Sequence, residues 1–289
     1  MLQYAAAANR WDIYRQQTLF LRRYLLQPSG HVRWKTDSSH RQKLGSNAAI
    51  DDLRIVRALL AGARKWGAAS DHRLAKEIAD ALLRDNRTGN LLADHYNTED
   101  GAKAETLTSS YLDPASMFVL AKEDSRWLPV AEASLKLLTE AAQPNGFYRK
   151  TYNLARGEWT DPAGSDRNMI DTLLAAIHAQ EAGAPPVPTL RLVQALWSRD
   201  GRLYGTYRDD LQAASADESP AVYALAVRLL EQAGEAERAK PLRSRLAQLA
   251  VQDPASPFYG GFLDPATLEC YSFDNLQALI VENGKRKQQ

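Results

Sequence analysis

The sequence lacks the features that would assign it to several common classes of protein. It has one cysteine, Cys270, in 289 residues, which excludes an intrachain disulfide framework and leaves the redox compartment open. No stretch is long and apolar enough for a membrane span, and the N-terminus has no basic region followed by an apolar one, as a signal peptide would. The five histidines are scattered without ligand spacing, so we expect no metal site and no cofactor.

The chain also lacks an excess of charge of either sign. It carries 36 basic and 35 acidic side chains, a formal net charge of +1, so nothing indicates a surface for nucleic acid or another polyanion. The length, with a hydrophobic content of 45%, suffices for one large core or two ordinary domains. The repeat described below favours a single domain over residues 1–289.

Helical periodicity dominates the sequence, in two alternating sets of segments. The first set is amphipathic, with charges on one side, and would suit an outer layer. This outer set comprises residues 11–27, 74–85, 127–143, 188–200 and 236–252. The second set is more apolar or alanine-rich, as helices packed on several sides should be, and each member has an acidic residue in or beside its first turn. This inner set comprises residues 51–67, 113–124, 168–183, 218–234 and 273–283.

A short aromatic stretch with glycine and β-favouring residues lies between each outer segment and the next inner one, which is a turn-and-strand pattern. Successive copies are marked by Trp34, Tyr96, Tyr148, Tyr204 and Phe262. The repeat of about 55 residues is slightly longer than common repeat units. Residues 1–8 would be the tail of a sixth inner helix. Six such helical hairpins predict an all-α fold, an (α/α)6 barrel with short strands in its connecting loops.

The acidic residues of the inner helices would then gather at one end of the barrel. Asp51 and Asp52 stand side by side in "GSNAAIDDLRIVRALLAGARKWG", and the helix dipole alone would favour acids in a first turn. An array of carboxylates and aromatic rings is also what a carbohydrate site needs. Sugar rings stack on aromatic faces, and carboxylates bind hydroxyls or perform acid–base chemistry.

Three segments carry a resemblance to a known family. "SNAAIDDLRIVRALLAGARKW", "TSSYLDPASMFVLA" and "GSDRNMIDTLLAAIHA" resemble, in order and spacing, the signature segments of glycoside hydrolase family 8. Tyr111 and Pro114 are in register with the second of these segments. The resemblance covers essentially the whole chain and is greatest to hydrolases of bacterial exopolysaccharide loci.

The chain departs from the pattern of that family at three places. By direct register the first signature aspartate falls on Ile50 and the second on Asp52, and a shift of one residue would let Asp51 stand in. The aspartate-to-arginine spacing of the fourth inner helix is not reproduced, so either Asp166 or Asp171 could be the catalytic base. The general acid of the family is a glutamate at the start of the first inner helix. We expect that helix to be incomplete here, with the acid missing from this chain.

The resemblance implies roles for individual residues. Asp171 or Asp166 would be the general base, and Asp51 or Asp52 would bind the sugar at the cleavage subsite. Tyr111 would contact the same sugar ring or the attacking water. Candidate stacking platforms are Trp34, Tyr96, Tyr148, Trp159 and Tyr204.

The same residues could instead have purely structural roles. Asp166 could be a helix N-cap, worth roughly 1 kcal/mol, and Tyr111 could be a core tyrosine. Asp171, inside an apolar helix, would be costly without a partner. Glu218 is expected to lie near a helix cap, and His178 to be structural.

The expected function is therefore an endo-acting, inverting hydrolase of a bacterial exopolysaccharide or β-glucan. Two alternatives are a non-catalytic (α/α)6 module that binds glycans and an (α/α)6 polysaccharide lyase or glucuronyl hydrolase, for which Arg167 and Arg208 could contact an acidic sugar. The only partner expected is the glycan. The resemblance implies a location outside the cell or in its envelope, and the sequence does not give an oligomeric state.

Overall fold

The computed structural model describes residues 1–37, 39, 44–162, 164–264 and 267–285. The chain divides into two compact units, each with its own set of packed helices. Unit 1 consists of Met1–Glu140 with Lys150–Thr160, and unit 2 of Ala141–Arg149 with Asp161–Gln289.

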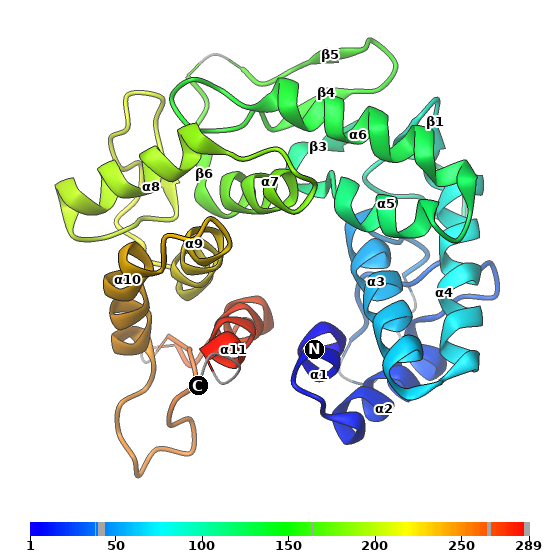
Figure 1. Cartoon of the computed structure of the whole chain (residues 1–289), viewed down its shortest axis with the longest axis horizontal. Coiled ribbons are helices and arrows are strands. Elements are labelled where there is room, and N and C mark those ends of the chain that lie inside the picture. Colours follow the sequence, from blue (N-terminus) through cyan, green and yellow to red (C-terminus); the bar gives the residue numbers. More distant parts are fainter. Residues whose placement is uncertain (38, 40–43, 163, 265–266, 286–289) are drawn as a thin grey trace. The chain divides into compact units, whose positions relative to one another are not determined.

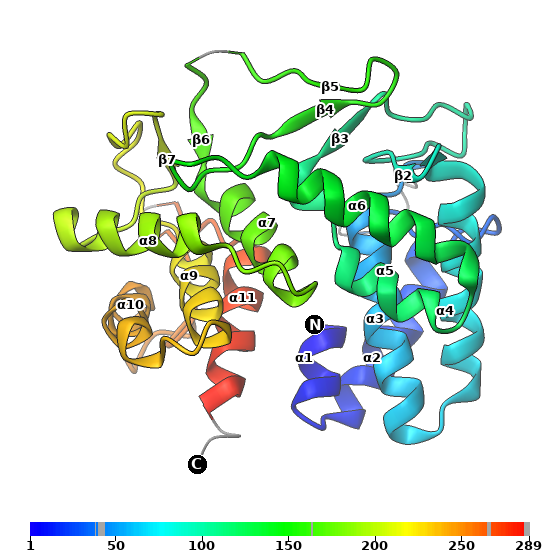
Figure 2. The ribbon, with the colours of Figure 1, turned by 45° about the horizontal axis from the view of Figure 1, so that its top comes forward.

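Unit 1 is built from helices that pack in pairs, with α3 beside α4 (Figure 1) and α1 beside both α2 and α3 (Figure 2). Its α-helices are α1 (Leu2–Ala7), α2 (Trp11–Phe20), α3 (Ala49–Trp66), α4 (Ala69–Ala81), α5 (Pro114–Ala121) and α6 (Leu128–Ala141). Two end in a π-helical turn, η1 (Leu21–Leu25) after α2 and η2 (Leu82–Asn86) after α4. Two 3₁₀ turns, η3 (Ser109–Tyr111) and η4 (Ser125–Trp127), precede α5 and α6.

The central helix of unit 1, α3, is buried along most of its length. Its interior includes Leu53 and Leu59, each 1% exposed or less. The phenol ring of Tyr14 lies directly on Gly62, where a Cβ atom would collide with ring atoms. The helix ends at Gly67, whose φ of 68° is the left-handed conformation that glycine adopts without strain.

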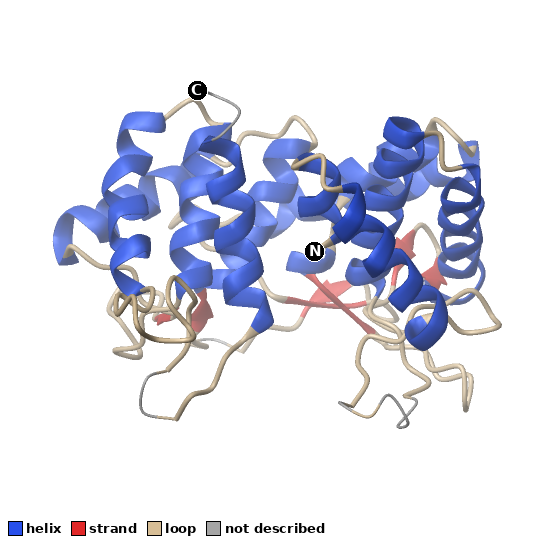
Figure 3. Cartoon of the chain, turned by 90° about the horizontal axis from the view of Figure 1, so that it is seen from below, coloured by secondary structure: helices blue, strands red, loops and turns tan. Residues whose placement is uncertain are grey.

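Short antiparallel strands lie at one end of the helices in each unit (Figure 3). In unit 1, β1 (Arg87–Thr88) pairs with β2 (Leu91–Leu92), and β3 (Thr106–Thr108), β4 (Thr151–Asn153) and β5 (Glu158–Trp159) form a three-stranded sheet. In unit 2, β6 (Arg167–Asn168) pairs with β7 (Thr206–Tyr207). The strands join the loops that lead into the N-termini of the inner helices.

Unit 2 is organised around α9, which is enclosed by its neighbours. Its helices are α7 (Met169–Glu181), α8 (Val187–Asp200), α9 (Pro220–Gln232), α10 (Ala236–Leu249) and α11 (Ser272–Lys285). In α9 every residue from Ala221 to Val227 is fully buried, which explains its alanine-rich composition. Figure 1 shows α9 between α10 and α11.

Two polar side chains hold α11 in place. The carboxylate of Asp274 accepts hydrogen bonds from Ser219 Oγ at 2.8 Å and from the Ala221 amide at 2.9 Å, which joins the N-termini of α11 and α9. Arg243 of α10, which is 8% exposed, donates to Glu231 at 2.5 Å and to Glu282 at 2.8 Å. The guanidinium therefore connects three helices.

The predicted helices of both sets are confirmed, with boundaries that differ by a few residues. The predicted strands are shorter than expected. Residues 259–264 form no strand, and the described part of residues 30–37 makes only isolated bridges, as at Val32. Pro265, the last residue of the predicted fifth stretch, lies outside the described residues.

Candidate functional site

The first turn of α3 places its two aspartates in different environments. The side chain of Asp51 is 49% exposed and lies 3.4 Å from Arg54. Asp52 is fully buried, with 0% exposure. Adjacent residues of a helix point about 100° apart, so one carboxylate faces outward and the other faces the interior. Asp51 can reach a ligand, and Asp52 cannot without rearrangement.

Asp52 belongs to a buried polar network rather than to an open site. Asn47 Nδ2 donates to Asp52 Oδ2 at 2.9 Å and to Asn86 Oδ1 at 3.1 Å. In the described chain, Asp52 Oδ1 accepts no well-aligned hydrogen bond, although the Val32 amide is close enough to favour the charged form. Burial nevertheless raises the pKa of Asp52 well above its ordinary value. The prediction of Asp52 as a sugar ligand is therefore corrected.

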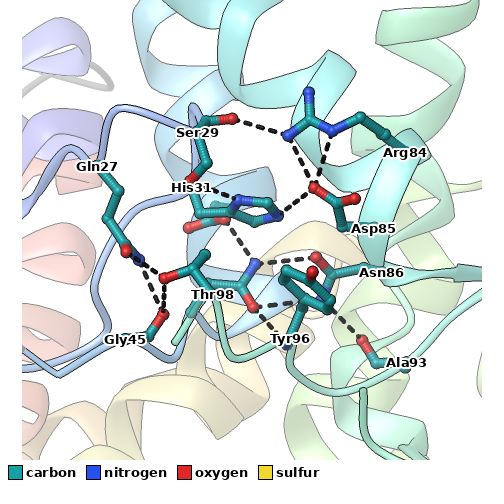
Figure 4. Close-up of polar contacts among 12 residues, drawn as sticks. Gln27, Ser29, His31, Gly45, Arg84, Asp85, Asn86, Ala93, Tyr96 and Thr98 are labelled. Carbon is teal, nitrogen blue, oxygen red and sulfur yellow. Dashed lines mark hydrogen bonds and ion pairs between the residues drawn. The ribbon is translucent and has the colours of Figure 1, made fainter. Parts of the chain in front are cut away.

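The same network fixes the loops around the head of α3 (Figure 4). Tyr96 donates its amide to Asn47 Oδ1 at 2.7 Å, and its ring stacks on His31 at 5.2 Å. His31 is fully buried, and its Nδ1 lies 3.0 Å from Ser29 Oγ, while its Nε2 lies 3.4 Å from a carboxylate oxygen of Asp85. Burial lowers the pKa of His31, which favours the neutral ring.

Asp94 is a half-buried carboxylate beside the head of α3 that sequence reasoning missed. Its main-chain oxygen accepts from the Ala49 amide at 2.9 Å. Its carboxylate accepts from the Thr108 amide at 2.7 Å and from the Thr108 hydroxyl at 2.8 Å. Burial raises the pKa of Asp94, against the opposing effect of these donors. A second carboxylate therefore lies next to the turn that carries Asp51.

Tyr111 lies on the 3₁₀ turn that connects β3 to α5, and it is half-buried. The following helix begins with Pro114 at its first position and Asp113 as its N-cap. The Asp113 carboxylate accepts from the Ser116 amide at 3.0 Å and from its hydroxyl at 2.5 Å. Since Thr108 is bonded to Asp94, the segment that carries Tyr111 is tied to the loop beside α3.

The predicted aromatic platforms of unit 1 have different exposures. Trp34 is 53% exposed, and Lys35 lies over its ring at 5.5 Å. Tyr96 and Trp159 are half-buried, and Trp159 meets Tyr152 of the neighbouring strand edge-on at 5.2 Å. All three therefore retain exposed surface.

In unit 2 the two candidate bases lie at the start of α7. Asp166 is exposed and precedes β6, while Asp171 is half-buried in the first helical turn. Asn168, and not Asp166, caps this helix, because its Oδ1 accepts from the Asp171 amide at 3.0 Å. Asp171 is therefore not an acid inside an apolar helix, as its neighbours in the sequence suggested.

In unit 2, the carboxylate of Glu218 and the guanidinium of Arg167 each form an ion pair. Glu218 binds Arg245 through two hydrogen bonds, at 2.6 and 2.9 Å, and accepts a third from Tyr223. Arg245 and Tyr223 lower the pKa of Glu218, which makes it a poor proton donor. Arg167, 8% exposed, donates to Asp209 at 2.7 and 3.2 Å. Glu218 thus has a structural role, and Arg167 is not free to bind an acidic sugar.

The remaining predicted platforms lie in unit 2, and one of them must be corrected. Tyr148 is 5% exposed, and burial raises its pKa to about 12. Its ring is part of the core and offers no face for a sugar. Tyr204 is half-buried beside Tyr207, with ring centroids 6.1 Å apart. His178, expected to be structural, is buried at 5% exposure.

The described residues contain no group of three or more histidine, cysteine, aspartate or glutamate side chains placed to hold a metal ion. Across the same residues, no helix has the length and apolarity to cross a membrane. A cavity of 620 Å³ lies in unit 1 beside Gly67, lined by residues that include Arg64, His72 and Lys122. It is at the C-terminal end of α3, away from Asp51.

Comparison with known proteins gives both a relative and a fold. No family model matches the chain. A protein of Bacillus subtilis (strain 168) named "Putative lipoprotein YdaJ" is 30% identical over 283 residues, which cover 97% of this chain and 76% of the relative.

Three solved structures share the fold along almost the whole chain. An alpha-amylase from Clostridium perfringens matches with a TM-score of 0.91 and 25% identity, over 98% of this chain and 84% of that one. PssZ from Listeria monocytogenes matches with a TM-score of 0.78 and 21% identity, over 98% and 83%. An endo-1,4-D-glucanase from Vibrio fischeri ES114 matches with a TM-score of 0.72 and 16% identity, over 99% and 85%. The predicted all-α, (α/α)6 fold class is confirmed.

Proposed function

The chain belongs to the family of the Bacillus subtilis protein named "Putative lipoprotein YdaJ", and we propose that it is a glycoside hydrolase that acts on a polysaccharide. The observation that carries this proposal is the match to an alpha-amylase over 98% of the chain, combined with solvent-accessible aspartates in the first turns of α3 and α7. Fold alone does not define activity. The carboxylates and exposed aromatic rings supply the chemistry that glycoside cleavage requires.

In unit 1, we assign sugar binding to Asp51, with Tyr111 and the exposed faces of Trp34, Tyr96 and Trp159. Asp51 is accessible and stands in the first turn of α3. A charged carboxylate accepts strong hydrogen bonds from sugar hydroxyls. Asp51 thereby takes the role that the sequence left open between Asp51 and Asp52.

In unit 2, we assign the general base to Asp171, with Asp166 as the alternative and Tyr204 as an aromatic contact. Asp171 is half-buried and its backbone amide is fixed by the Asn168 cap, so the start of its side chain has a defined position. A general base that activates a water molecule must be held in a fixed position and must be reachable by that water. Asp166 is exposed and has less to hold it in one orientation.

The finer proposal is an endo-acting, inverting enzyme of glycoside hydrolase family 8. An inverting enzyme holds its acid and base about 6.5–9.5 Å apart to admit a water molecule. The structural relatives include an alpha-amylase and an endo-1,4-D-glucanase, so α- and β-glucans are the first substrates to test, followed by bacterial exopolysaccharide. The lipoprotein name of the sequence relative supports a location in the cell envelope or outside the cell.

The test uses the purified chain with soluble starch, mixed-linkage β-glucan, xylan and an extracted bacterial exopolysaccharide, followed by a reducing-end assay. Since no residue is assigned here as the general acid, we expect the parent chain to cleave the active glycan slowly. Asp171→Asn should lower that hydrolysis roughly 10²–10⁴-fold, the usual contribution of acid–base assistance. Asp51→Asn should raise KM as well as lower kcat. Glu237→Gln is the matched control, because Glu237 is also in a first helical turn, that of α10.

Full activity in the Asp171→Asn protein would remove that assignment and make Asp166→Asn the next variant. Retention of glycan in a binding assay with no new reducing ends on any of the four glycans would support a non-catalytic glycan-binding module instead. If the chain neither binds nor cleaves any of the four glycans, the proposal is wrong.

A further inference from the structure

Three fully buried polar side chains connect the first turn of α3 to the loop of residues 93–96. Asp52, Asn47 and Asn86 are each 1% exposed or less. They come from α3, from the loop before it and from the end of η2. We propose that these three residues position the segment 93–96, and that Asp94 and Tyr96 on this segment bind a sugar ring of the substrate. The sugar-binding part of this inference rests on the proposed function.

Asn47 is the centre of the connection, because both ends of its amide are used. Its Nδ2 donates to Asp52 and to Asn86, and its Oδ1 accepts from the Tyr96 amide at 2.7 Å and from Asn86 Nδ2 at 3.3 Å. The main-chain amide of Asn47 also donates to the Tyr96 carbonyl at 3.1 Å. The backbone of Tyr96 is therefore held through both its N–H and its C=O group.

Asn86 fixes the other end of the segment. Its Nδ2 donates to the Ala93 carbonyl at 3.4 Å, and the Ala93 amide donates to the Asn86 carbonyl at 2.9 Å. Between these two anchors, the carbonyl of Asp94 accepts from the amide of Ala49 at 2.9 Å. The loop is thus bonded to the end of η2, to Asn47 and to the first turn of α3.

A buried polar network of this kind costs free energy of folding compared with apolar packing, so we expect it to have a specific role. Apolar side chains would fill the same space without desolvating an acid and two amides. Hydrogen bonds, unlike apolar contacts, specify one arrangement of the backbone groups that they join. Asp52 supplies an acceptor for Asn47 in this arrangement, and its charge is not required.

The side chains of Asp94 and Tyr96 are also fixed by contacts with neighbouring residues. The carboxylate of Asp94 is fixed by the amide and hydroxyl of Thr108, and the ring of Tyr96 rests on the buried imidazole of His31. Both remain half-buried rather than enclosed. A carboxylate and an aromatic ring in fixed positions, two residues apart, can bind a hydroxyl and the apolar face of a sugar.

The positioning part is tested by amide hydrogen exchange of the purified chain without any ligand. Asn47→Ala should speed exchange in residues 93–98 by about tenfold or more, since it removes the side-chain acceptor of the Tyr96 amide and the bonds to Asn86. Asn90→Ala is the matched control: Asn90 is exposed in the turn between β1 and β2 and bonds only to Arg87 among the contacts described. Exchange in residues 93–98 within about twofold of the parent chain in Asn47→Ala would overturn the positioning role.

The sugar-binding part is tested by affinity electrophoresis in gels containing soluble starch or β-glucan. Asp94→Asn and Tyr96→Ala should each weaken retardation about tenfold, and Asn47→Ala should weaken it too, because the segment that carries both residues is no longer held. Asp52→Asn should bind far better than Asp52→Ala, because the amide keeps the acceptor for Asn47. Retardation of Asp94→Asn equal to that of Asn90→Ala would overturn the role of Asp94.

The two proposals fail in different ways. If the parent chain is retarded and cleaves none of the four glycans, the enzyme proposal fails and the sugar-binding role stands. If the parent chain is not retarded in either gel, the sugar-binding role is wrong, and hydrogen exchange still decides the positioning role.

Discussion

Replacing Asp52 with asparagine should change how the stability of the chain depends on pH. Asp52 is fully buried, and burial raises its pKa well above the ordinary value. The folded state therefore holds this proton more tightly than the unfolded state. Between the unfolded and the folded pKa, the free energy of unfolding of the parent chain should fall by about 1.36 kcal/mol per pH unit through this group.

Asp52→Asn removes this pH dependence of the free energy of unfolding and keeps an oxygen that accepts from Asn47. Below the unfolded pKa of about 3.9, where the carboxyl is protonated in both states, variant and parent should differ by less than about 1 kcal/mol. As pH rises, the variant should gain on the parent by about 1.4 kcal/mol per unit, until the pKa of the folded state is passed. Asp52→Ala should be less stable than Asp52→Asn by about 1–3 kcal/mol at every pH, because Asn47 loses its partner.

The assay is urea unfolding at several pH values from 4.5 to 8 and constant ionic strength, followed by tryptophan fluorescence. Five of the six tryptophans belong to unit 1, since Trp197 alone lies in unit 2, so the signal reports mainly on the unit that contains Asp52. A difference between Asp52→Asn and parent that stays flat across this range would refute the reasoning. It would mean that Asp52 titrates in the fold as it does in water.

Three further substitutions test individual contacts of the fold. Arg243→Ala should destabilise unit 2 by roughly 1–3 kcal/mol and expose residues 272–283 to proteolysis, because the pairs with α9 and α11 are lost; unchanged cleavage there would be contrary evidence. Gly62→Ala should lower stability by about 1–3 kcal/mol despite the better helix propensity of alanine, because the new methyl group meets the ring of Tyr14; a raised Tm would show that the ring moves freely. Asp113→Ala should cost about 0.5–2 kcal/mol as a lost N-cap, as measured by thermal unfolding, and no change would mean that another group caps α5.

The helices could be predicted from the sequence because their signals are local. Apolar residues at helical spacing recur within each segment, and turn residues such as Gly67 mark the ends. The strands were harder, since a strand of two residues depends on a partner far along the chain. Arg167 pairs with Tyr207, for instance, and no pattern within either segment identifies that pairing.

The environments of the acidic residues could not be predicted in the same way. Asp51 and Asp52 differ in exposure because adjacent helical side chains diverge, and which one faces inward depends on Asn47 and Asn86. Asp94 lies in a loop without periodicity, and its setting is created by Thr108, fourteen residues later. Chemistry that depends on contacts between distant segments leaves little trace in either segment alone.

The aromatic residues show the same limit. Each marks a repeat, and sequence alone does not separate packing from binding. Tyr148 is buried at 5% exposure, whereas Trp34 at the equivalent place in an earlier repeat is 53% exposed. Only the rings that keep some exposed surface remain among the proposed sugar contacts.

The central claim, that the chain hydrolyses a glycan, is tested most directly by cleavage in water enriched in ¹⁸O. We expect products from one of the four glycans to carry a single ¹⁸O atom at each new reducing end, as hydrolysis requires. We also expect the label to disappear with the activity in Asp171→Asn and to persist in Glu237→Gln. Products without ¹⁸O that absorb as unsaturated sugars, or no products from any of the four glycans, would show that the chain is not a glycoside hydrolase for these substrates.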